Sequence, residues 1–427
     1  MRAVIARAGE PAPGVLRNAD FRFLWAGQTV SLIGSQVSLI ALPLLAVMTL
    51  GAGPFQVGVL AALGRLPWLL FGLPAGAWAD RSRRRPLLIG ADLVRAAALA
   101  WIPAASVLGV LTLGQVYAVA LVAGTMTVLF EVAAPSLLPS LVAPERLVDG
   151  NSRLEMSRAG AEAVGPGLGG VVVQAVTAPL AIIVDVVSFL ASAVLLARIG
   201  TRETRGDDRA GRGSFRTEIR EGLRFVLRHP LLRWNVFVAA LANLFGSALL
   251  AILVLYVLTG LGLRPALIGL VLGLGSLGGV LGAAVATRLF RRIGLGPTLA
   301  VGLSATAAGA LLLAAVTGPY PLRVLWAVAA VMLTVFGVPV FDVAVVTLRQ
   351  LTTPDRLLGR VNATMRFLVF GTMPAGALAG GALAEEAGLR TTVLAAGIGL
   401  ATPVLLVLVS PLARLKAQSI TTLGDTP

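Results

Sequence analysis

Cysteine is absent from this chain of 427 residues, and histidine and lysine occur once each, as His229 and Lys416. The absence of cysteine excludes disulfides, thiolate metal sites and a cysteine nucleophile. The one histidine lies in a charged stretch, so it cannot form a Ser-His pair within an apolar segment and leaves little for metal chemistry. Because Lys416 is the sole lysine, no GxxxxGK[ST] phosphate loop exists. We therefore expect no enzymatic activity, no cofactor and no metal.

Charged residues are also scarce, at 13% of the chain, whereas 57% is hydrophobic and the mean hydropathy is +0.89. Soluble enzymes of this length are much less apolar, so most of the sequence is expected to lie in a lipid bilayer. The net charge of +15 comes mainly from arginines grouped between apolar segments. A nucleic-acid partner would require basic residues on one water-exposed face, and we expect no such partner.

Twelve apolar runs are long enough to cross a bilayer, whose core of about 30 Å takes roughly 20 helical residues. The first run is too long, and too closely followed by others, to be a cleaved signal peptide. The runs lie at 22–50, 55–79, 86–109, 115–141, 152–176, 179–199, 231–259, 265–290, 297–317, 322–349, 361–385 and 390–413.

The connections between these runs differ in charge on the two sides of the predicted membrane. Residues 80–86, 288–294 and 198–233 share one side and are rich in arginine, whereas three connections on the other side carry only Arg323. Short basic loops remain in the cytoplasm. We therefore expect a multi-pass protein of the cell membrane with both termini in the cytoplasm.

The longest connection separates six runs from six. Its apolar residues recur at helical spacing after Ser214, a favourable N-cap, and predict a short amphipathic helix on the inner membrane surface. These residues are Phe215, Ile219, Leu223, Val226 and Leu227. The predicted organisation is an N-terminal six-helix bundle at 1–200, a connector at 201–230, and a C-terminal six-helix bundle with a short tail at 231–427.

The two groups of runs repeat each other in sequence. The matching segments are ADRSRRR (79–85) with ATRLFRR (286–292), FEVA (130–133) with FDVA (341–344), PERL (144–147) with PDRL (354–357), and Asn151 with Asn362. Landmarks in the same order and at nearly the same offset indicate a duplication. Internal repeats of six helices are typical of secondary transporters, in which the substrate is handled between the halves.

Paired glycines predict where the two halves meet. Within the runs, GxxxG spacing occurs only in the second, fifth, eighth and eleventh, and such pairs let helices approach closely in lipid. Because these four runs are related by the repeat, we expect the halves to contact each other along them. The pairs are Gly72 with Gly76, Gly165 with Gly169, Gly275 with Gly279, and Gly376 with Gly380.

Two motifs resemble those of the major facilitator superfamily. GAWADRSRRR (76–85) is similar to its G-x-x-x-D-R-x-x-R-R signature between helices 2 and 3, and GPGLGG (165–170) to the GPxxGG motif associated with antiporters. ADLVRA (91–96), EGLRFVLRHPLLR (221–233) and PDRLLGRVNA (354–363) resemble bacterial drug:proton antiporters, a group that includes macrolide and enterobactin exporters. The resemblance covers essentially the whole chain. It implies an all-α membrane fold of twelve helices in two pseudo-symmetric six-helix bundles that work by alternating access.

The resemblance also implies roles for particular residues. Opposite charges in a gating loop can pair in one state and separate in the other. The alternative account is that the arginines only hold that loop inside the cell. The gating residues are Gly76, Asp80, Arg81, Arg84 and Arg85. Because Thr287 stands in place of the aspartate in the second half, we expect an asymmetric latch. A helix-bend motif, or a passive kink, is expected at Gly165, Pro166, Gly169 and Gly170.

Two acids interrupt apolar runs at matching positions, Glu131 and Asp342. A charge at mid-bilayer costs about 2.5 to 3.5 kcal/mol on insertion scales, so each acid needs a partner, water or a proton. In one interpretation, one or both bind protons in competition with substrate. In the other, each stays ionised and bonded to an arginine or to backbone amides. Both remain open, since helix 4 lacks the arginine that many proton-coupled drug antiporters carry there.

Several other charges fall within the runs. Asp92 and Arg95 are spaced i, i+3, so an intrahelical ion pair is the simplest account of them. Arg65, Asp185 and Arg366 have no partner that the sequence identifies.

Polar residues in the first run form a stripe, because Gln28, Ser31, Ser35 and Ser38 share one helical face. The seventh run carries a similar set. We expect a cavity lined by Gln28, Ser31, Ser35, Asn243 and Ser247, although packing between helices is the stronger account of Ser31 and Ser38. So few polar groups suit an amphipathic or lipophilic compound.

The sequence thus predicts a monomeric secondary transporter that exports drug-like small molecules in exchange for protons. A carrier of one dedicated metabolite or lipid-like substrate is the alternative. A membrane sensor without transport is less favoured, because residues 414–427 are too few for a signalling domain.

Overall fold

The structure is a computed structural model that describes residues 15–81, 83–143, 146–201 and 215–414. Within these ranges it contains helices and no strand. The first half of the chain forms η1 (Val15–Arg17), α2 (Ala19–Met48), α3 (Pro54–Arg81), α4 (Arg84–Val107), α5 (Leu113–Leu141), α6 (Leu147–Val176) and α7 (Ala178–Ala197).

The second half follows the same plan after the connector. It forms α8 (Phe215–Arg228), α9 (Pro230–Leu255), η3 (Tyr256–Gly260), α10 (Pro265–Ile293), α11 (Leu295–Ala315), α12 (Tyr320–Thr352), α13 (Asp355–Phe370), α14 (Met373–Ala387), α15 (Leu389–Val409) and η4 (Pro411–Arg414).

Eleven helical stretches of the described chain are long and apolar enough to cross a membrane. The twelfth predicted segment corresponds to α6, which has 30 residues but is continuously apolar only over Val164–Val176. Its first half carries charged residues such as Arg153 and Glu162. All twelve predicted segments therefore occur as helices, and α6 is the most polar of them.

The two halves begin with similar helix starts. Asn18 caps α2, since its side-chain oxygen accepts hydrogen bonds from the backbone N–H of Asp20 at 2.9 Å and of Phe21 at 3.1 Å. His229 caps α9, its Nδ1 accepting from the N–H of Leu232 at 3.5 Å. Each cap satisfies N–H groups that the first helical turn leaves without a partner.

The eleventh predicted helix is broken near its middle, at Gly371 and Thr372 between α13 and α14. A break frees backbone groups, which must be satisfied within the protein in a membrane. Ser247 of α9 donates to the carbonyl oxygen of Met373 at 2.6 Å, and Thr372 donates to that of Ala240 at 3.0 Å. Hydroxyl groups at the α9 contact therefore support the break.

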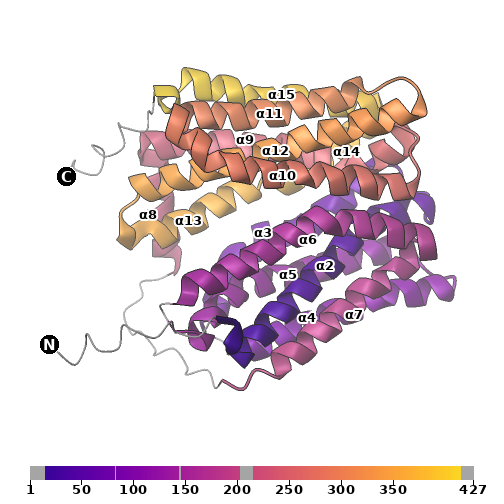
Figure 1. Ribbon diagram of the computed structural model, residues 1–427, viewed down its shortest axis with the longest axis horizontal. Coiled ribbons are helices and arrows are strands. Elements are labelled where there is room, and N and C mark those ends of the chain that lie inside the picture. The colour runs from indigo at the N-terminus through magenta and orange to yellow at the C-terminus, as the bar shows by residue number, and fades with distance from the viewer. Residues whose placement is uncertain (1–14, 82, 144–145, 202–214, 415–427) are drawn as a thin grey trace.

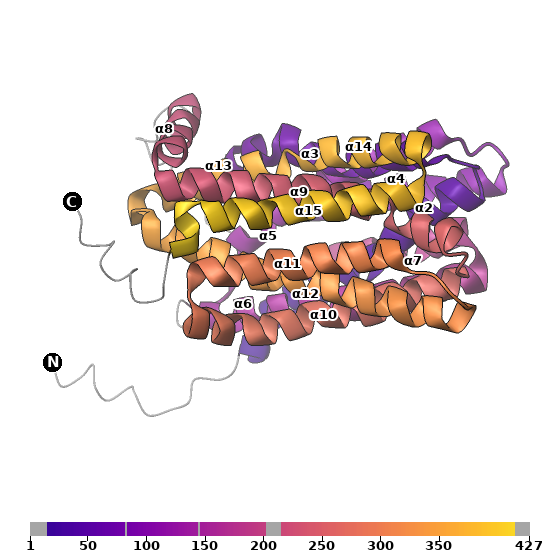
Figure 2. The ribbon, with the colours of Figure 1, turned by 90° about the horizontal axis from the view of Figure 1, so that it is seen from above.

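The predicted amphipathic helix is present as α8. Its predicted N-cap, Ser214, lies outside the described residues, but Val226 is fully buried against Leu232 of α9 and Val361 of α13. Glu221 forms an ion pair with Arg360 of α13. Figure 2 shows α8 beside α13, at one end of the molecule. The helix thus docks on the second half.

Helices α2–α7 form one bundle and α9–α15 the other (Figure 1). We call the end where α2 begins and η4 lies the terminal face, and the end with the turns after α2, α4 and α11 the loop face. Between the bundles, α6 packs on α10 and α3 on α14. These are the four helix positions that the GxxxG pattern predicted.

Candidate functional site

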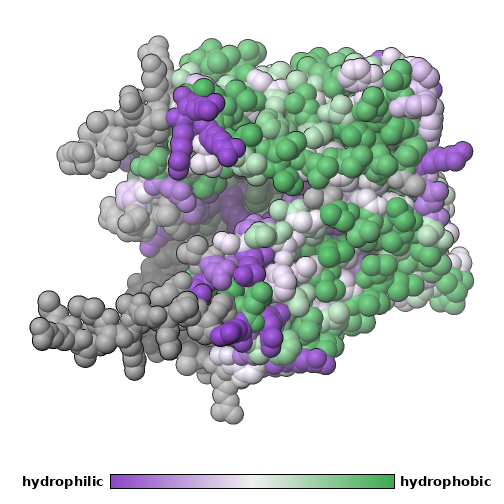
Figure 3. Space-filling model, viewed as in Figure 1, coloured by the Kyte–Doolittle hydropathy of each residue, from purple (hydrophilic) through white to green (hydrophobic). Residues whose placement is uncertain are grey.

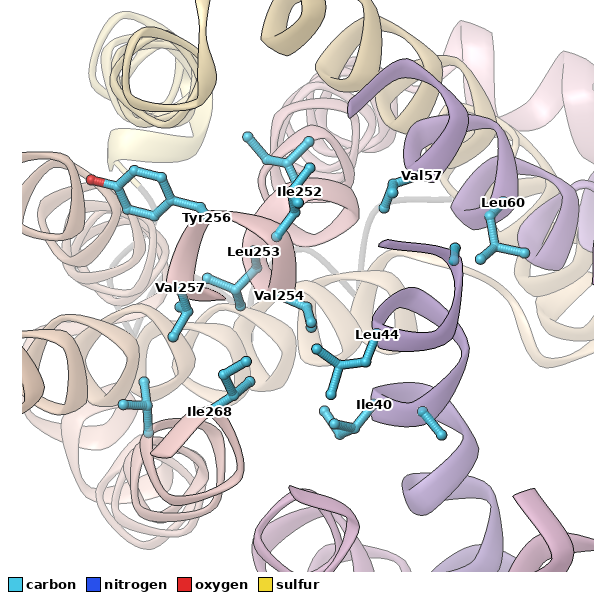
Figure 4. Packing of buried hydrophobic residues seen from close by; sticks show 14 of the residues in the cluster. Ile40, Leu44, Val57, Leu60, Ile252, Leu253, Val254, Tyr256, Val257 and Ile268 are labelled. Carbon is cyan, nitrogen blue, oxygen red and sulfur yellow. The ribbon is translucent and has the colours of Figure 1, made fainter. Parts of the chain in front are cut away.

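The loop face is closed by apolar side chains from both bundles. Ile40 and Leu44 of α2 and Val57 of α3 belong to one continuous buried cluster with Ile252 of α9 and Ile268 of α10. Figure 4 shows these residues pointing toward one another from the two halves. We call this group the plug.

Glycines bring the helices of the two bundles together around the plug, although not the glycines that the sequence suggested. A Cβ added to Gly58 would lie 2.8 Å from the Cα of Gly381, and one added to Gly170 would lie 2.6 Å from the Cα of Gly269. Only glycine permits these two crossings, which join α3 to α14 and α6 to α10. The helix pairs were predicted correctly.

Most described members of the GxxxG pairs instead pack within a bundle. Gly165 and Gly169 face Gln36 and Val37 of α2. The remaining contacts run from Gly275 and Gly279 to α12, and from Gly376 and Gly380 to α9. The helix-bend motif therefore has a packing role: Gly165 and Gly169 seat α6 on α2, Gly170 seats it on α10, and Pro166 lies inside the unbroken helix.

A carboxylate also joins the halves at the loop face. Glu385, near the end of α14, accepts a hydrogen bond through Oε2 from the backbone N–H of Phe55 at 3.2 Å. Phe55 lies in the first turn of α3, where N–H groups have no helical partner and the helix dipole favours an anion. One bundle thus caps a helix of the other.

Toward the terminal face the bundles separate. Figure 3 shows a hollow between them that opens at this end, with polar residues inside it and an apolar outer surface around it. At the α3–α13 contact, the guanidinium of Arg366 lies 5.6 Å from the ring centre of Trp68 and 5.9 Å from that of Phe370. Arg65 donates to the sulfur of Met373 at 3.5 Å. Both arginines, for which the sequence offered no partner, thus contact groups of the opposite or neighbouring helix.

The most buried charges of the described chain lie in the first bundle. Asp92 and Arg95 of α4 form the predicted ion pair, and their side chains are 0% and 5% exposed. The Arg95 guanidinium lies between two rings, 4.6 Å from the centre of Phe130 on α5 and 4.1 Å from that of Phe189 on α7. Such cation–π contacts are strongest where water is excluded.

Asp185 of α7 lies close to this pair, in a seam between α7 and α2. It is 2% exposed, and its Oδ1 accepts from Ser188 at 3.1 Å and from Ser35 at 3.4 Å. Ser38 is also beside it, and Arg95 interacts with it electrostatically. Gly34 makes room for the seam, because a Cβ there would lie 2.9 Å from Oδ1 of Asp185 and would overlap Ser188.

The two acids predicted to bind protons have different surroundings. Glu131 of α5 is half-buried and lies within the electrostatic reach of Arg95 and of Glu162 on α6. Asp342 of α12 is exposed, and its charged neighbour is Arg349 on the same helix. Matched sequence positions have therefore not produced matched environments.

The predicted cavity-lining residues divide into two groups. Gln28 and Asn243 are partly exposed, and Asn243 donates to the carbonyl oxygen of Ala239 at 3.0 Å. Ser31 and Ser38 are buried in the helix packing, as the alternative account expected. Ser35 binds Asp185 and Ser247 supports the α13–α14 break, so both hydroxyls serve contacts within the protein.

The gating loop is only partly described. The side chains of Gly76, Asp80 and Arg81 lie outside the described residues, and Arg84 is half-buried. Arg85 donates to the carbonyl oxygen of Leu196 at 3.0 Å and to that of Ala197. These carbonyls end α7, where a cation is favoured by the helix dipole. The described bonds of Arg85 thus hold α4 to α7 within one bundle.

Two groups of this site were missed from the sequence. Asp185 was noted only as lacking a partner, although Asp185, Ser188 and Ser192 are spaced 3 and 4 apart and so share one helical face. Glu385 carried no signal, because its bond to Phe55 joins residues 330 positions apart. Among the described residues, no group of three potential metal ligands occurs.

Known proteins resemble this arrangement. The chain is 28% identical to the multidrug efflux pump Tap of Mycolicibacterium fortuitum over 379 residues, covering 85% of this chain and 88% of the pump. It is 40% identical to macrolide efflux protein A of Streptococcus pyogenes over 79 residues, or 18% and 19% of the two chains.

The fold is also found among solved structures. A bacterial homologue of the iron transporter ferroportin, crystallised in an inward-facing state, superposes with a TM-score of 0.72 at 19% identity, over 93% of this chain and 99% of that one. The model of the family described as transmembrane secretion effector matches residues 10–425. The chain therefore belongs to this family of major facilitator superfamily membrane transporters.

Proposed function

We propose that this transporter is a monomeric exporter of amphipathic or lipophilic, drug-like small molecules that works by alternating access in exchange for protons. The observation that carries the proposal is the hollow between the two bundles, which is open at the terminal face and sealed by the plug at the loop face. A second state, with the seal at the other end, would complete a transport cycle.

The charge distribution supports a cytoplasmic position for the terminal face and both chain ends. The arginine-rich connection 288–294 and the amphipathic helix α8 lie there, whereas the turns of the loop face carry few basic residues. Short basic loops remain in the cytoplasm. The hollow then opens to the cytoplasm and accepts substrate from there, while the plug lies toward the outside of the cell.

Side chains of the α3–α13 contact and of α12 support an amphipathic substrate. Trp68 and Phe370 offer aromatic surface beside the exposed Arg366, and the exposed Asp342 adds a carboxylate on α12. Pockets of this kind bind mainly through apolar contact and fix orientation with a few polar groups. The relative named as a multidrug efflux pump supports the same substrate class.

One or both of Glu131 and Asp342, each in one bundle, are the proposed proton-coupling acids. The moving bodies would be residues 1–200 and 231–427, joined by the connector at 201–230. The gating loop with Asp80 and Arg81 would lock the terminal face in the opposite state, when the two bundles approach each other there.

Transport is tested in a host that lacks its own efflux pumps. Wild type and the double variant Glu131→Gln, Asp342→Asn are expressed at equal membrane levels, and accumulation of lipophilic dyes and antibiotics is measured with and without an uncoupler. We expect uncoupler-sensitive export by wild type and its loss in the variant. If the uncoupler does not change export by wild type, proton coupling is contradicted. If wild type exports none of the compounds, the drug-like substrate class is contradicted.

Alternating access is tested at the loop face through Glu385. Glu385→Ala removes a cross-bundle cap worth about 0.5–2 kcal/mol and should shift molecules toward a state open at that face. Because the chain has no cysteine, Asn243→Cys provides a single site for a membrane-impermeant maleimide added outside the cell. We expect faster labelling in the Glu385→Ala background.

The neighbouring Glu386 is the matched control, since it is equally exposed and one residue farther along α14. Glu386→Ala should label at the wild-type rate. Equal rates in all three backgrounds would show that the Glu385 bond does not hold the loop face closed.

A further inference from the structure

We propose that Asp185 of α7 is a proton-binding group of the exporter and that Arg95 of α4 shifts between Asp92 and Asp185 as the proton leaves and returns. The inference deepens the proposed function and rests on its proton coupling. It concerns a residue that lies outside the hollow, in the packing of the first bundle.

The partners of Asp185 suit both forms of a carboxyl group. Hydroxyl groups of Ser35 and Ser188 donate to its Oδ1, and a hydroxyl can equally accept a hydrogen bond from a protonated carboxyl. Asp92 differs, because it forms an ion pair with Arg95, whose guanidinium only donates, in addition to lying beside the hydroxyl of Ser192. The ion pair favours the anionic form of Asp92, whereas the hydrogen bonds given for Asp185 come from hydroxyls, so the seam accommodates a proton without losing hydrogen bonds.

The charges around Asp185 do not balance if every carboxyl is ionised. From α4 it faces Arg95 and, through that residue, Asp92; from α5, Glu131 also interacts electrostatically with Arg95. In the described structure α2 contributes the hydroxyls of Ser35 and Ser38, and Glu162 of α6, which has Arg158 as its own cation, reaches Glu131. Arg95 then serves three carboxyl groups, two of them buried, which is costly unless a proton is bound.

Arg95 is placed to move between the acids. Rings of Phe130 and Phe189 hold its guanidinium from two sides, and attraction to a ring face is less directional than a hydrogen bond. Its Nε and the Oδ2 of Asp92 are buried without a hydrogen-bond partner among the described residues. The pair is therefore incompletely satisfied, so a second arrangement forfeits few bonds.

The cycle conserves charge and protons. A proton taken from water joins an oxygen of Asp185, the new O–H donates to a seam hydroxyl, and Arg95 stays on Asp92. On release the proton returns to water. Asp185 is then an anion, and Arg95 moves toward it, which draws α4 and α7 together. A packing change in the first bundle thus accompanies each proton.

Infrared spectroscopy tests proton binding without any substrate. Purified full-length protein in lipid is titrated with acid and base, and the band of protonated carboxylic acids is followed. We expect the pH-dependent band of wild type to contain a component that is missing in Asp185→Asn. Asp149→Asn is the control, because Asp149 forms a half-exposed i, i+4 ion pair with Arg153, and it should keep that component. Spectra of wild type and Asp185→Asn that change equally with pH overturn the proposal.

A second variant keeps the test valid if Asp185→Asn does not fold. Ser188→Ala removes one hydroxyl from the carboxyl without changing the acid itself. It should shift the pH midpoint of the band, because the two forms of Asp185 use that hydroxyl differently. A purely structural Asp185 predicts lower thermal stability with no shift, and that result contradicts proton binding.

Transport separates this inference from the proposed function. Ethidium is the probe, in vesicles with and without an imposed pH gradient. We expect Asp185→Asn to retain exchange of ethidium down its gradient while losing accumulation driven by pH. If wild type shows no response to the pH gradient, proton coupling fails. If wild type responds and Asp185→Asn responds equally, only the assignment of Asp185 fails.

Discussion

The first and second bundles share repeated sequence landmarks, but their acidic side chains have different surroundings. In the first bundle, Asp92 and Asp185 are buried with Arg95 and two aromatic rings. In the second, Asp342 is exposed and has Arg349 as its charged neighbour. Glu131 and Asp342 keep matching positions in the repeat, whereas Asp92 and Asp185 have no acidic counterpart at the same offset in the second half.

This difference suggests a division of labour between the bundles. A buried acid surrounded by hydroxyls can hold a proton but cannot touch a substrate, whereas an acid with an exposed side chain can meet a cationic substrate. The first bundle therefore carries the features of a proton site and the second those of a substrate contact. Separation of the two sites requires them to communicate through the contact between the bundles.

Loss of the central cation should have the largest effect. Arg95→Gln leaves Asp92 as a buried, unpaired charge, which costs about 3–5 kcal/mol. The paired variant Asp92→Asn, Arg95→Gln should recover most of this loss. The measurement is the fraction of monodisperse protein after heating, followed by size-exclusion chromatography.

The second bundle supplies the control for this change. Arg366 is exposed over Trp68 and Phe370, so Arg366→Gln should cost no more than about 1 kcal/mol. If Arg95→Gln and Arg366→Gln lower the thermal stability by the same amount, the buried charge of the first bundle is no more important for stability than the exposed charge of the second.

The first helices of the two bundles provide the next comparison. Gly34→Ala in α2 would press a methyl group into Ser188 and Asp185, and overpacking of this kind costs about 1–3 kcal/mol. Gly246→Ala in α9 meets nothing within 4 Å, so it should be neutral or stabilising by up to about 1 kcal/mol through helix propensity. Thermal unfolding of both variants tests the prediction, and a tolerated Gly34→Ala would argue against a tightly packed seam.

Asp342→Asn should act on substrate binding more than on coupling. An exposed ion pair contributes about 0.2–1 kcal/mol, so the KM for a cationic dye should rise by up to about fivefold. Its accumulation should still respond to the pH gradient. The measurement is the transport rate of a cationic and of a neutral substrate by wild type and Asp342→Asn at several pH values. Loss of the pH response would show that Asp342 is itself one of the coupling acids, and it would weaken the division between the bundles.

The sequence predicted the fold because a membrane imposes strong constraints on composition. Runs of apolar residues, arginine-rich connections and the repeat located the helices, and the GxxxG pattern named the helices that join the bundles. It chose the wrong glycines, since small residues are needed wherever helices cross closely, within a bundle or between bundles. Gly58 and Gly381 belong to no such pair, yet they touch across the interface.

The site was less predictable because polar residues in a membrane protein have several uses. The stripe of Ser31, Ser35 and Ser38 indicated a face of α2 that avoids lipid, but its partner turned out to be Asp185 on α7, 150 residues beyond Ser35. Periodicity along one helix says which residues share a face. It does not say which distant helix covers that face, and the identity of that helix decides between a cavity and a buried site.

The smallest expected effect separates the helix caps of the two bundles. Burial lowers the pKa of His229, whereas Asn18, which caps α2, does not titrate. The folded protein then binds a proton at His229 less readily than the unfolded chain, so stability falls as the pH drops below about 6.5. A protonated Nδ1 also cannot accept a hydrogen bond from the N–H of Leu232.

The variant His229→Asn should keep a helix cap and abolish the loss of stability at low pH. We expect this loss to be below about 1 kcal/mol. Thermal unfolding against pH provides the measurement, with Asn18→Ala as the variant that should lower stability equally at every pH. If the thermal stability of wild type and of His229→Asn depends on pH in the same way, protonation of His229 does not weaken the α9 cap. The loss of stability in acid would then come from carboxyl groups alone.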